Sequence, residues 1–341
     1  MVAPRNPPWS TRCPPSPAHR EVAASALASA FGAADLRIAP VPGGASSAQG
    51  YRVDVAAERY LMRIEGPRTP LRNPHQYTCM RIAADAGVAP PVIHTDDEAG
   101  VAIMRFLPQR PLADFPGGPV GLARAVGELS ARLQATPAFP VLADYRDIIG
   151  QLLAAARGRF APGLLEPHIE GFQRIRDAYP WDPGALVSSH NDPNPSNIIY
   201  DGERLWLIDW ETAYRNDPLV DLAILANNHA RSPDLEAAML QAWLGRAPDR
   251  MLLSRLTVMR LVTALYYAAL IFTVTTPPGA ESYASLEAPD LEAFLAAVAA
   301  GRLSSMGPNA ITTLGLVNLG VFQAGVATPA FRDALAVVQG G

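Results

Sequence analysis

The chain has 341 residues, of which 49% are hydrophobic and 18% charged, so it can bury the core of one large domain or of two coupled domains. A formal net charge of −4 argues against a nucleic-acid-binding protein, which would normally carry a basic stripe. Two distant cysteines, Cys13 and Cys79, exclude a disulfide framework, and the six histidines lack the short spacings of a zinc site, so a cytoplasmic setting is expected.

The first third of the chain alternates between short strand-like and helical patterns. Residues 1–17 are rich in proline and predict a disordered arm. The elements expected after this arm are a helix over 19–31, strands over 51–55 and 60–65 joined by a turn at Glu58-Arg59, a helix over 74–86, and strands over 92–94 and 101–106. Residues 18–107 therefore predict a small, sheet-rich N-terminal lobe.

Longer helical patterns dominate after Pro108. Helices are expected over 120–134, 145–157, 167–178, 219–229, 235–244, 250–274 and 291–300, with a strand-turn-strand unit over 187–210. The mostly apolar run from Leu261 to Val274 is shorter than the ~20 residues that span a bilayer, which favours a core helix and no membrane partner. The sequence thus predicts an α+β protein whose larger, mainly helical C-terminal lobe covers residues 108–341, and nothing indicates an obligate protein partner.

One stretch combines residue types that carry chemistry. His190, Asp192 and Asn197 form an H-x-D-x4-N pattern, and Asp209 follows Asn197 after 12 residues. The pair Asp201-Gly202 between them is a strong hairpin signal. Two strands joined by this turn would place Asn197 and Asp209 side by side, with Asp192 on the preceding loop facing the same cleft.

Phosphoryl transfer requires such a set of groups. One carboxylate must orient the acceptor hydroxyl and take its proton, while a second carboxylate and an amide oxygen hold magnesium against the phosphates. Asp192, Asn197 and Asp209 supply these three groups.

The same stretch resembles the choline/ethanolamine kinase and aminoglycoside phosphotransferase superfamily. The resemblance rests on His190-Asn191-Asp192, the later Asn197, the run Ile208-Asp209-Trp210-Glu211, and the run from Arg215 to Ala223. It implies a protein-kinase-like fold that uses ATP and Mg²⁺ to phosphorylate a small-molecule hydroxyl.

The resemblance also implies roles for single residues. Asp192 matches the catalytic aspartate, and His190 matches a neighbouring residue that braces the catalytic loop. Asn197 and Asp209 match the metal ligands. Asp221 matches a buried aspartate that ties the loop to the next helix, although a solvated charge at that helix N-terminus is equally compatible with its position.

On the nucleotide side, the resemblance implies a phosphate-facing loop at Gly43, Gly44, Ser46 and Ser47. Leu61 is expected against the adenine, and Met104 and Phe106 at the hinge that receives the base. Because the chain has no lysine, Arg63 is expected to reach the phosphates where the wider kinase fold uses lysine. The helix glutamate that pairs with this lysine is also missing, and Gln76 is the closest polar substitute.

The acceptor is the least constrained part of the prediction. Glu211 and Asn194 match positions near the acceptor in choline-kinase-like proteins, which favours a choline-like amino alcohol. Coordination of the metal and pairing with Arg215 are alternative roles for Glu211. An aminoglycoside or sugar kinase, or a catalytically inactive kinase-like module that binds nucleotide, are the alternatives.

Overall fold

The computed structural model describes residues 17–32, 34–41, 48–66, 73–275, 282–304 and 307–340. Residues 1–16 of the predicted arm lie outside the described residues. The predicted phosphate-facing residues Gly43, Gly44, Ser46 and Ser47 also lie outside them.

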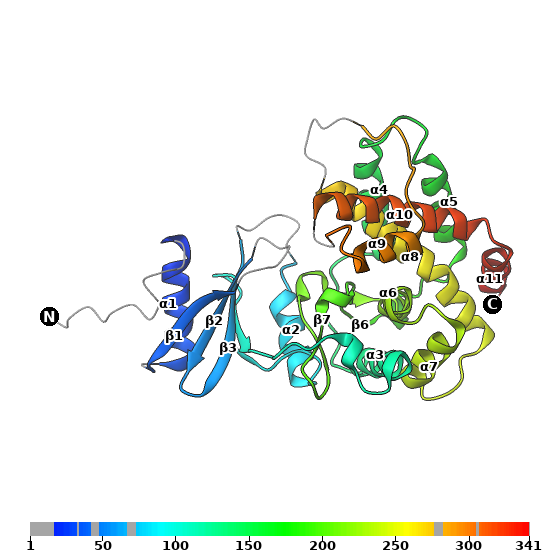
Figure 1. Ribbon diagram of the computed structural model, residues 1–341. Coiled ribbons are helices and arrows are strands. Elements are labelled where there is room, and N and C mark those ends of the chain that lie inside the picture. Colours follow the sequence, from blue (N-terminus) through cyan, green and yellow to red (C-terminus); the bar gives the residue numbers. More distant parts are fainter. Residues whose placement is uncertain are drawn as a thin grey trace.

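The N-terminal lobe is a five-stranded antiparallel sheet with a helix on each side (Figure 1). The strand order is β1-β2-β3-β5-β4. Its elements are α1 (Pro17–Phe31), β1 (Leu36–Val41), β2 (Gln49–Val55), β3 (Glu58–Ile64), α2 (Gln76–Asp85), β4 (Val92–Asp96) and β5 (Val101–Arg105).

Two details of this sheet differ from the prediction. The hairpin between β2 and β3 turns at Ala56-Ala57, because Val55 pairs with Glu58 in the register. Glu58 and Arg59 are the first two residues of β3 and have exposed side chains, so they belong to the strand and not to the turn. Strand β1 was not predicted. It contains Pro40, which is tolerated because β1 is an edge strand that pairs with β2 alone.

The C-terminal lobe is mainly helical, as predicted. Its helices are α3 (Gly118–Gln134), α4 (Tyr145–Arg157), α5 (Glu166–Ala178), α6 (Leu219–His229), α7 (Pro233–Leu244), α8 (Arg250–Val274), α9 (Leu291–Ala299), α10 (Pro308–Val326) and α11 (Pro329–Gln339). By length and composition α8 and α10 resemble membrane spans, but α8 is largely buried and packs against α4, α6, α10 and α11. The predicted core role of α8 is therefore confirmed.

Two short two-stranded sheets interrupt these helices. β6 (Val187–Ser189) pairs with β9 (Tyr214–Asn216), and β7 (Ile198–Tyr200) pairs with β8 (Leu205–Leu207). Short 3₁₀ turns lie at Leu112–Asp114, Pro183–Ala185, Pro195–Asn197 and Trp210–Thr212. β7 lies beside α2, where the two lobes meet, and β6 lies nearer α6 (Figure 1), while both β6 and β8 contact α3.

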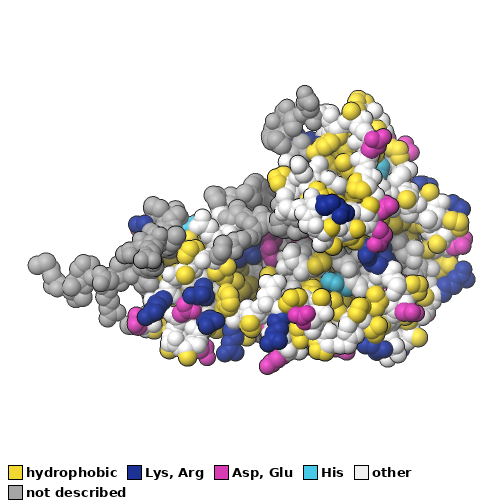
Figure 2. Space-filling view, viewed as in Figure 1, with side chains coloured by type: hydrophobic (Ala, Val, Ile, Leu, Met, Phe, Trp, Pro, Cys, Tyr) yellow, Lys and Arg dark blue, Asp and Glu magenta, His cyan; other side chains and the backbone are white. Residues whose placement is uncertain are grey.

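Two hydrophobic cores hold the lobes. One lies between α1 and the sheet, around Leu27, Val53 and Ile103. The larger core fills the C-terminal lobe and continues through α2, whose Cys79 and Met80 belong to it, to Ala102 and Met104 of β5. The sheet is therefore attached to the helical lobe through α2, and buried apolar side chains connect the two lobes beneath the cleft. On the face shown in Figure 2, acidic and basic side chains are interspersed over the described surface of both lobes.

Candidate active site

The loop after β6 is fixed by its backbone. Asp221, the third residue of α6, is buried, and its carboxylate accepts hydrogen bonds from the backbone amides of His190 (2.8 Å) and Asn191 (2.7 Å). Asp221 thus ties the loop to α6. Burial raises the pKa of Asp221 to about 6, and the two amide hydrogen bonds oppose that rise.

Removal of the Asp221 carboxylate should lower the stability of the protein. The Asp221→Ala substitution leaves two buried amides without acceptors and should lower the free energy of unfolding by about 2–5 kcal/mol. Urea unfolding followed by circular dichroism measures the change. Asp234→Ala, on the exposed first turn of α7, is the control and should cost far less. Equal stability of the two variants would contradict the role given to Asp221.

The turn that presents Asp192 is also held by side chains. Asn191 has a positive φ of 64°, a conformation that asparagine adopts more readily than most residues. The side-chain Nδ2 of Asn191 donates to the carbonyl of Thr212 (2.9 Å), and its Oδ1 accepts from the side-chain amide of Asn216 (2.7 Å). The loop is consequently anchored to β9 as well as to α6, so Asp192 is held before any ligand binds.

His190 lies under this loop and does not face the cleft. It is fully buried, its ring packs 4.7 Å from that of Trp210, and its Nε2 lies 2.8 Å from the carbonyl of Ile208. Burial lowers the pKa of His190 to about 4, so the ring is neutral at physiological pH. These contacts give His190 a bracing position.

Three side chains donate four hydrogen bonds to the carboxylate and the backbone carbonyl of Asp192. The amide of Asn194 donates to Oδ1 (2.8 Å), and so does the hydroxyl of Tyr267 from α8. Asn197 Nδ2 donates to Oδ2 (3.1 Å) and to the Asp192 carbonyl (2.9 Å). Burial is the main reason that the pKa of Asp192 rises to about 6, and the three side-chain hydrogen bonds oppose it.

Asn194 and Asn197 are both engaged within the loop. Besides its bond to Asp192, Asn194 accepts from the backbone amide of Ser196 (2.8 Å) and so caps the turn at Pro195–Asn197. In this structure Asn194 holds the loop, and its predicted contact with the acceptor stays a prediction. Because Asn197 Nδ2 donates to Asp192, its Oδ1 is the atom left to face a cation.

The predicted hairpin brings Asn197 and Asp209 together. β7 and β8 pair with Ile198 opposite Leu207, and Ile208 N donates to the carbonyl of Asn197 (3.0 Å). Asp209 follows at once, with a positive φ of 68° that turns the chain out of the strand. Asn197 and Asp209 therefore sit at the same end of one hairpin, beside Asp192.

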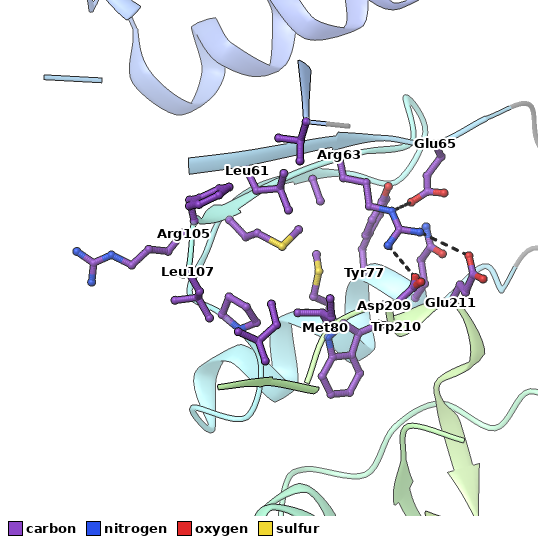
Figure 3. A pocket seen from close by; sticks show the side chains of 18 of the residues that line it. Leu61, Arg63, Glu65, Tyr77, Met80, Arg105, Leu107, Asp209, Trp210 and Glu211 are labelled. Carbon is purple, nitrogen blue, oxygen red and sulfur yellow. Dashed lines mark hydrogen bonds and ion pairs between the residues drawn. The ribbon is translucent and has the colours of Figure 1, made fainter. Parts of the chain in front are cut away.

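A cavity of about 440 Å³ lies between this hairpin and the N-terminal sheet (Figure 3). Its size is that of a small-molecule site. One end is apolar and the other is charged. The apolar end is lined by Leu61, Met80, Ala102, Met104, Phe106, Leu107, Ile199 and Ile208, and the charged end by Arg63, Glu65, Gln76, Asp209 and Glu211.

Arg63 crosses the cleft from β3 and contacts three carboxylates. It binds Asp209 at 2.7 Å, Glu65 at 3.4 Å and Glu211 at 3.7 Å, as the dashed lines in Figure 3 show. Gln76, at the start of α2, is buried and lines the same end of the cavity, and its Nε2 has no hydrogen-bond partner among the described residues. Asp209, Glu65 and Glu211 therefore take the place of a helix glutamate as partners of Arg63.

The charged end of the cleft carries an excess of negative charge. Burial, followed by the charge of Asp209, raises the pKa of Glu211 to about 6, while Arg63 lowers it. Asp192 is near enough to raise the Glu211 pKa further. Three carboxylates, those of Glu65, Asp209 and Glu211, contact the single guanidinium of Arg63, so the site favours additional cations.

Comparison with known families agrees with this geometry. The Phosphotransferase enzyme family matches residues 37–253, which is more than half of the chain and includes every residue of the site described above except Tyr267. The chain belongs to this family. A curated relative, an uncharacterized protein from Metamycoplasma hominis, is 34% identical over 85 residues, which are 24% of this chain and only 16% of that protein.

Solved structures with a similar fold are more completely covered. A choline/ethanolamine kinase family protein from Mesorhizobium loti has a TM-score of 0.65 and 21% identity. The match covers 95% of this chain and 100% of that chain. A spectinomycin phosphotransferase in complex with ADP and spectinomycin has a TM-score of 0.52 and 15% identity. The match covers 92% of this chain and 95% of that chain. At these identities the likeness concerns the fold, and it confirms the predicted kinase-like arrangement of a sheet lobe and a helical lobe.

Most of the predicted site residues that the structure describes lie together in this chain. Leu61, Arg63, Met104, Phe106, Asp209 and Glu211 line the cavity, while Asp192, Asn194 and Asn197 form the adjoining loop. Glu211 faces Arg63, and no pairing with Arg215 is seen among the described residues. Sequence reasoning had not predicted Tyr267 as a partner of Asp192, nor Glu65, Asp209 and Glu211 as partners of Arg63.

Proposed function

We propose that the phosphotransferase transfers the γ-phosphoryl group of Mg-ATP to the hydroxyl of a small, positively charged amino alcohol. The observation that supports this most strongly is the convergence of Asp192, Asn197 and Asp209 beside the cavity that Arg63 enters. A phosphotransferase needs a proton acceptor, ligands for a cation and a fixed positive charge at such a point.

In the proposed reaction Asp192 acts as the base. The acceptor O–H bond breaks and its proton moves to the Asp192 carboxylate. The acceptor oxygen forms a bond to the γ-phosphorus, the bond from that phosphorus to the bridging oxygen breaks, and ADP leaves. Because the loop carrying Asp192 is held by Asp221 and Asn191, this carboxylate needs little rearrangement to meet the acceptor.

The apolar end of the cavity suits the base of the nucleotide, and the charged end suits its phosphates. Leu61, Met104 and Ile208 line the apolar end, and Arg63 supplies a fixed charge at the other. The structure of the spectinomycin phosphotransferase, which has the same fold, contains ADP. Arg63 is expected to exchange part of its contact with Asp209 for phosphate oxygens.

The residues at the hairpin end fit a magnesium ion. Mg²⁺ prefers oxygen ligands and is usually held by one or two carboxylates together with substrate phosphates. The Asp209 carboxylate and Asn197 Oδ1 provide such ligands, and within the described part of the chain no group of three or more His, Cys, Asp or Glu competes for a metal. When bound, the ion would neutralise charge on the phosphates.

The charge of the cleft favours a cationic acceptor. Three carboxylates contact one guanidinium, the charge of Asp192 also acts on Glu211, and Mg-ATP adds further negative charge. Glu211 is the least enclosed of the three partners of Arg63, and the charge of Asp192 raises its pKa. An ammonium group a few ångströms from the reacting hydroxyl would neutralise Glu211.

A panel of choline, ethanolamine, aminoglycosides and neutral sugars tests the proposed acceptor class. We expect the amino alcohols to be phosphorylated best, and Glu211→Gln to raise their KM by about 10-fold through loss of one charge contact. Glu65→Gln, which also removes a partner of Arg63, is the control and should spare the acceptor KM. Preferred phosphorylation of neutral sugars, unaffected by Glu211→Gln, would contradict the cationic acceptor.

A further inference from the structure

Tyr267 connects the core helix of the C-terminal lobe to the catalytic loop. It lies in the middle of α8, and its hydroxyl donates to Asp192 Oδ1 across 75 residues of sequence. Its ring packs against that of Tyr266, with centroids 5.5 Å apart, and Tyr266 packs in turn on Tyr145 at 5.4 Å. The hydroxyl is therefore aimed by a packed row of rings on α8 and α4.

The two oxygens of Asp192 are not equally occupied. Oδ1 accepts from Tyr267 and from Asn194, whereas the described residues give Oδ2 one donor, Asn197 Nδ2 at 3.1 Å. Each oxygen of an ionised carboxylate offers about two lone-pair sites. Two donors therefore fill Oδ1, and Oδ2 keeps a free site.

We infer that Tyr267 is a positioning residue that, together with Asn194, occupies Oδ1 and so directs Oδ2 to the acceptor hydroxyl. The inference rests on the proposed function, since it concerns the same proton transfer: the acceptor proton moves to Asp192 Oδ2 while the acceptor oxygen bonds to the γ-phosphorus and ADP leaves. Tyr267 gives up no proton in this step.

The surroundings of Tyr267 suit a permanent donor. Burial, followed by the charge of Asp192, raises the pKa of the Tyr267 hydroxyl well above its ordinary value, so the hydroxyl stays protonated. The carboxylate gains a donor that cannot lose its proton at working pH. Asn194, the other donor to Oδ1, belongs to the loop itself, so among the described residues Tyr267 is the donor from a helix of the C-terminal lobe that reaches the Asp192 carboxylate.

The Tyr267→Phe substitution tests this role, because it removes the hydroxyl and keeps the ring. Tyr179→Phe is a matched control. Tyr179 is more deeply buried than Tyr267, and its hydroxyl also donates to an aspartate, Asp217 Oδ2 at 3.1 Å, but in a different contact network, with Arg255. With the best acceptor from the panel, Tyr267→Phe should lower kcat about 10–100-fold, the effect of losing a hydrogen bond to a charged group. The KM values for Mg-ATP and for the acceptor should change by less than about 2-fold, and Tyr179→Phe should leave kcat unchanged.

A double-mutant cycle shows whether Tyr267 acts through Asp192. In the Asp192→Asn background, adding Tyr267→Phe should change the residual rate by less than about 2-fold, because the carboxylate that Tyr267 positions is gone. A full additional loss in that background would overturn the inference. So would an unchanged kcat in Tyr267→Phe alone, or a raised acceptor KM at constant kcat, which would place the hydroxyl on the acceptor.

If the wild-type protein phosphorylates no acceptor, the proposed function fails and the inference fails with it. An active wild type with an equally active Tyr267→Phe variant removes the inference alone.

Discussion

Replacing Asp192 with asparagine should reduce phosphoryl transfer by about 10²–10⁴-fold, the usual cost of losing a general base. The amide is close in shape to the carboxylate but cannot take the acceptor proton. Nucleotide binding should be nearly unchanged, since Asp192 does not line the cavity that holds Arg63 and Asp209. Steady-state kinetics and calorimetry with ATP measure the two effects separately.

The surroundings of Asp192 call for a stability control. In Asp192→Asn, the new amide group must face either Asn197 on one side or Tyr267 and Asn194 on the other, and all three are donors. Melting temperatures of wild type and variant should therefore be compared. Asp192→Ala, which introduces no opposing donor, is a second variant that removes the carboxylate. A near-normal kcat in either variant would remove Asp192 from the mechanism.

Asp209→Ala should abolish the effect of magnesium on nucleotide binding and lower kcat by about 10²–10³-fold, because charge stabilisation at the phosphates is lost. Calorimetric titrations of ATP with and without Mg²⁺ measure the first effect. The wild type should bind more tightly with the ion, whereas the variant should bind with one affinity under both conditions.

Asp209 also pairs with Arg63, and this second role needs its own control. Glu65→Gln removes another partner of Arg63 while leaving Asp209 and Asn197 in place. It should keep the magnesium effect on ATP binding. If Asp209→Ala and Glu65→Gln behave alike, or if Asp209→Ala retains full magnesium dependence, Asp209 is a structural partner of Arg63 and not a metal ligand.

The sequence predicted those parts of the site that depend on local geometry. The Asp201-Gly202 turn signal was enough to place Asn197 and Asp209 at one end of a hairpin, because a two-strand unit fixes its own register. The loop carrying Asp192 lies directly before that hairpin. Its position therefore followed from the same short segment.

Contacts between distant segments were beyond the sequence patterns. Arg63 and Asp209 are 146 residues apart, and Tyr267 lies 75 residues after Asp192. The position of Tyr267 in an apolar helix is typical of a core aromatic, and nothing in the periodicity of α8 distinguishes a hydroxyl that reaches the catalytic loop. Only the packing of α8 against the loop shows it.

Helix α10 was not among the helices predicted from the sequence. α10 contains glycines, which lower the helix signal of the sequence. In the structure Gly315 lies where a Cβ atom would come within 2.8 Å of the Phe272 ring, so the glycine allows α10 to approach α8 closely. A residue that weakens the local pattern is thus needed by the tertiary packing.

The most direct test of the proposed function follows the γ-phosphate itself. Purified protein is incubated with γ-³²P-labelled ATP, Mg²⁺ and the acceptor panel, and labelled products are separated and counted, with Asp192→Asn in parallel. The wild type should transfer label to a small amino alcohol, and the variant should transfer almost none. No labelled acceptor with the wild type, or equal labelling by the variant, would contradict a phosphotransferase that works through Asp192.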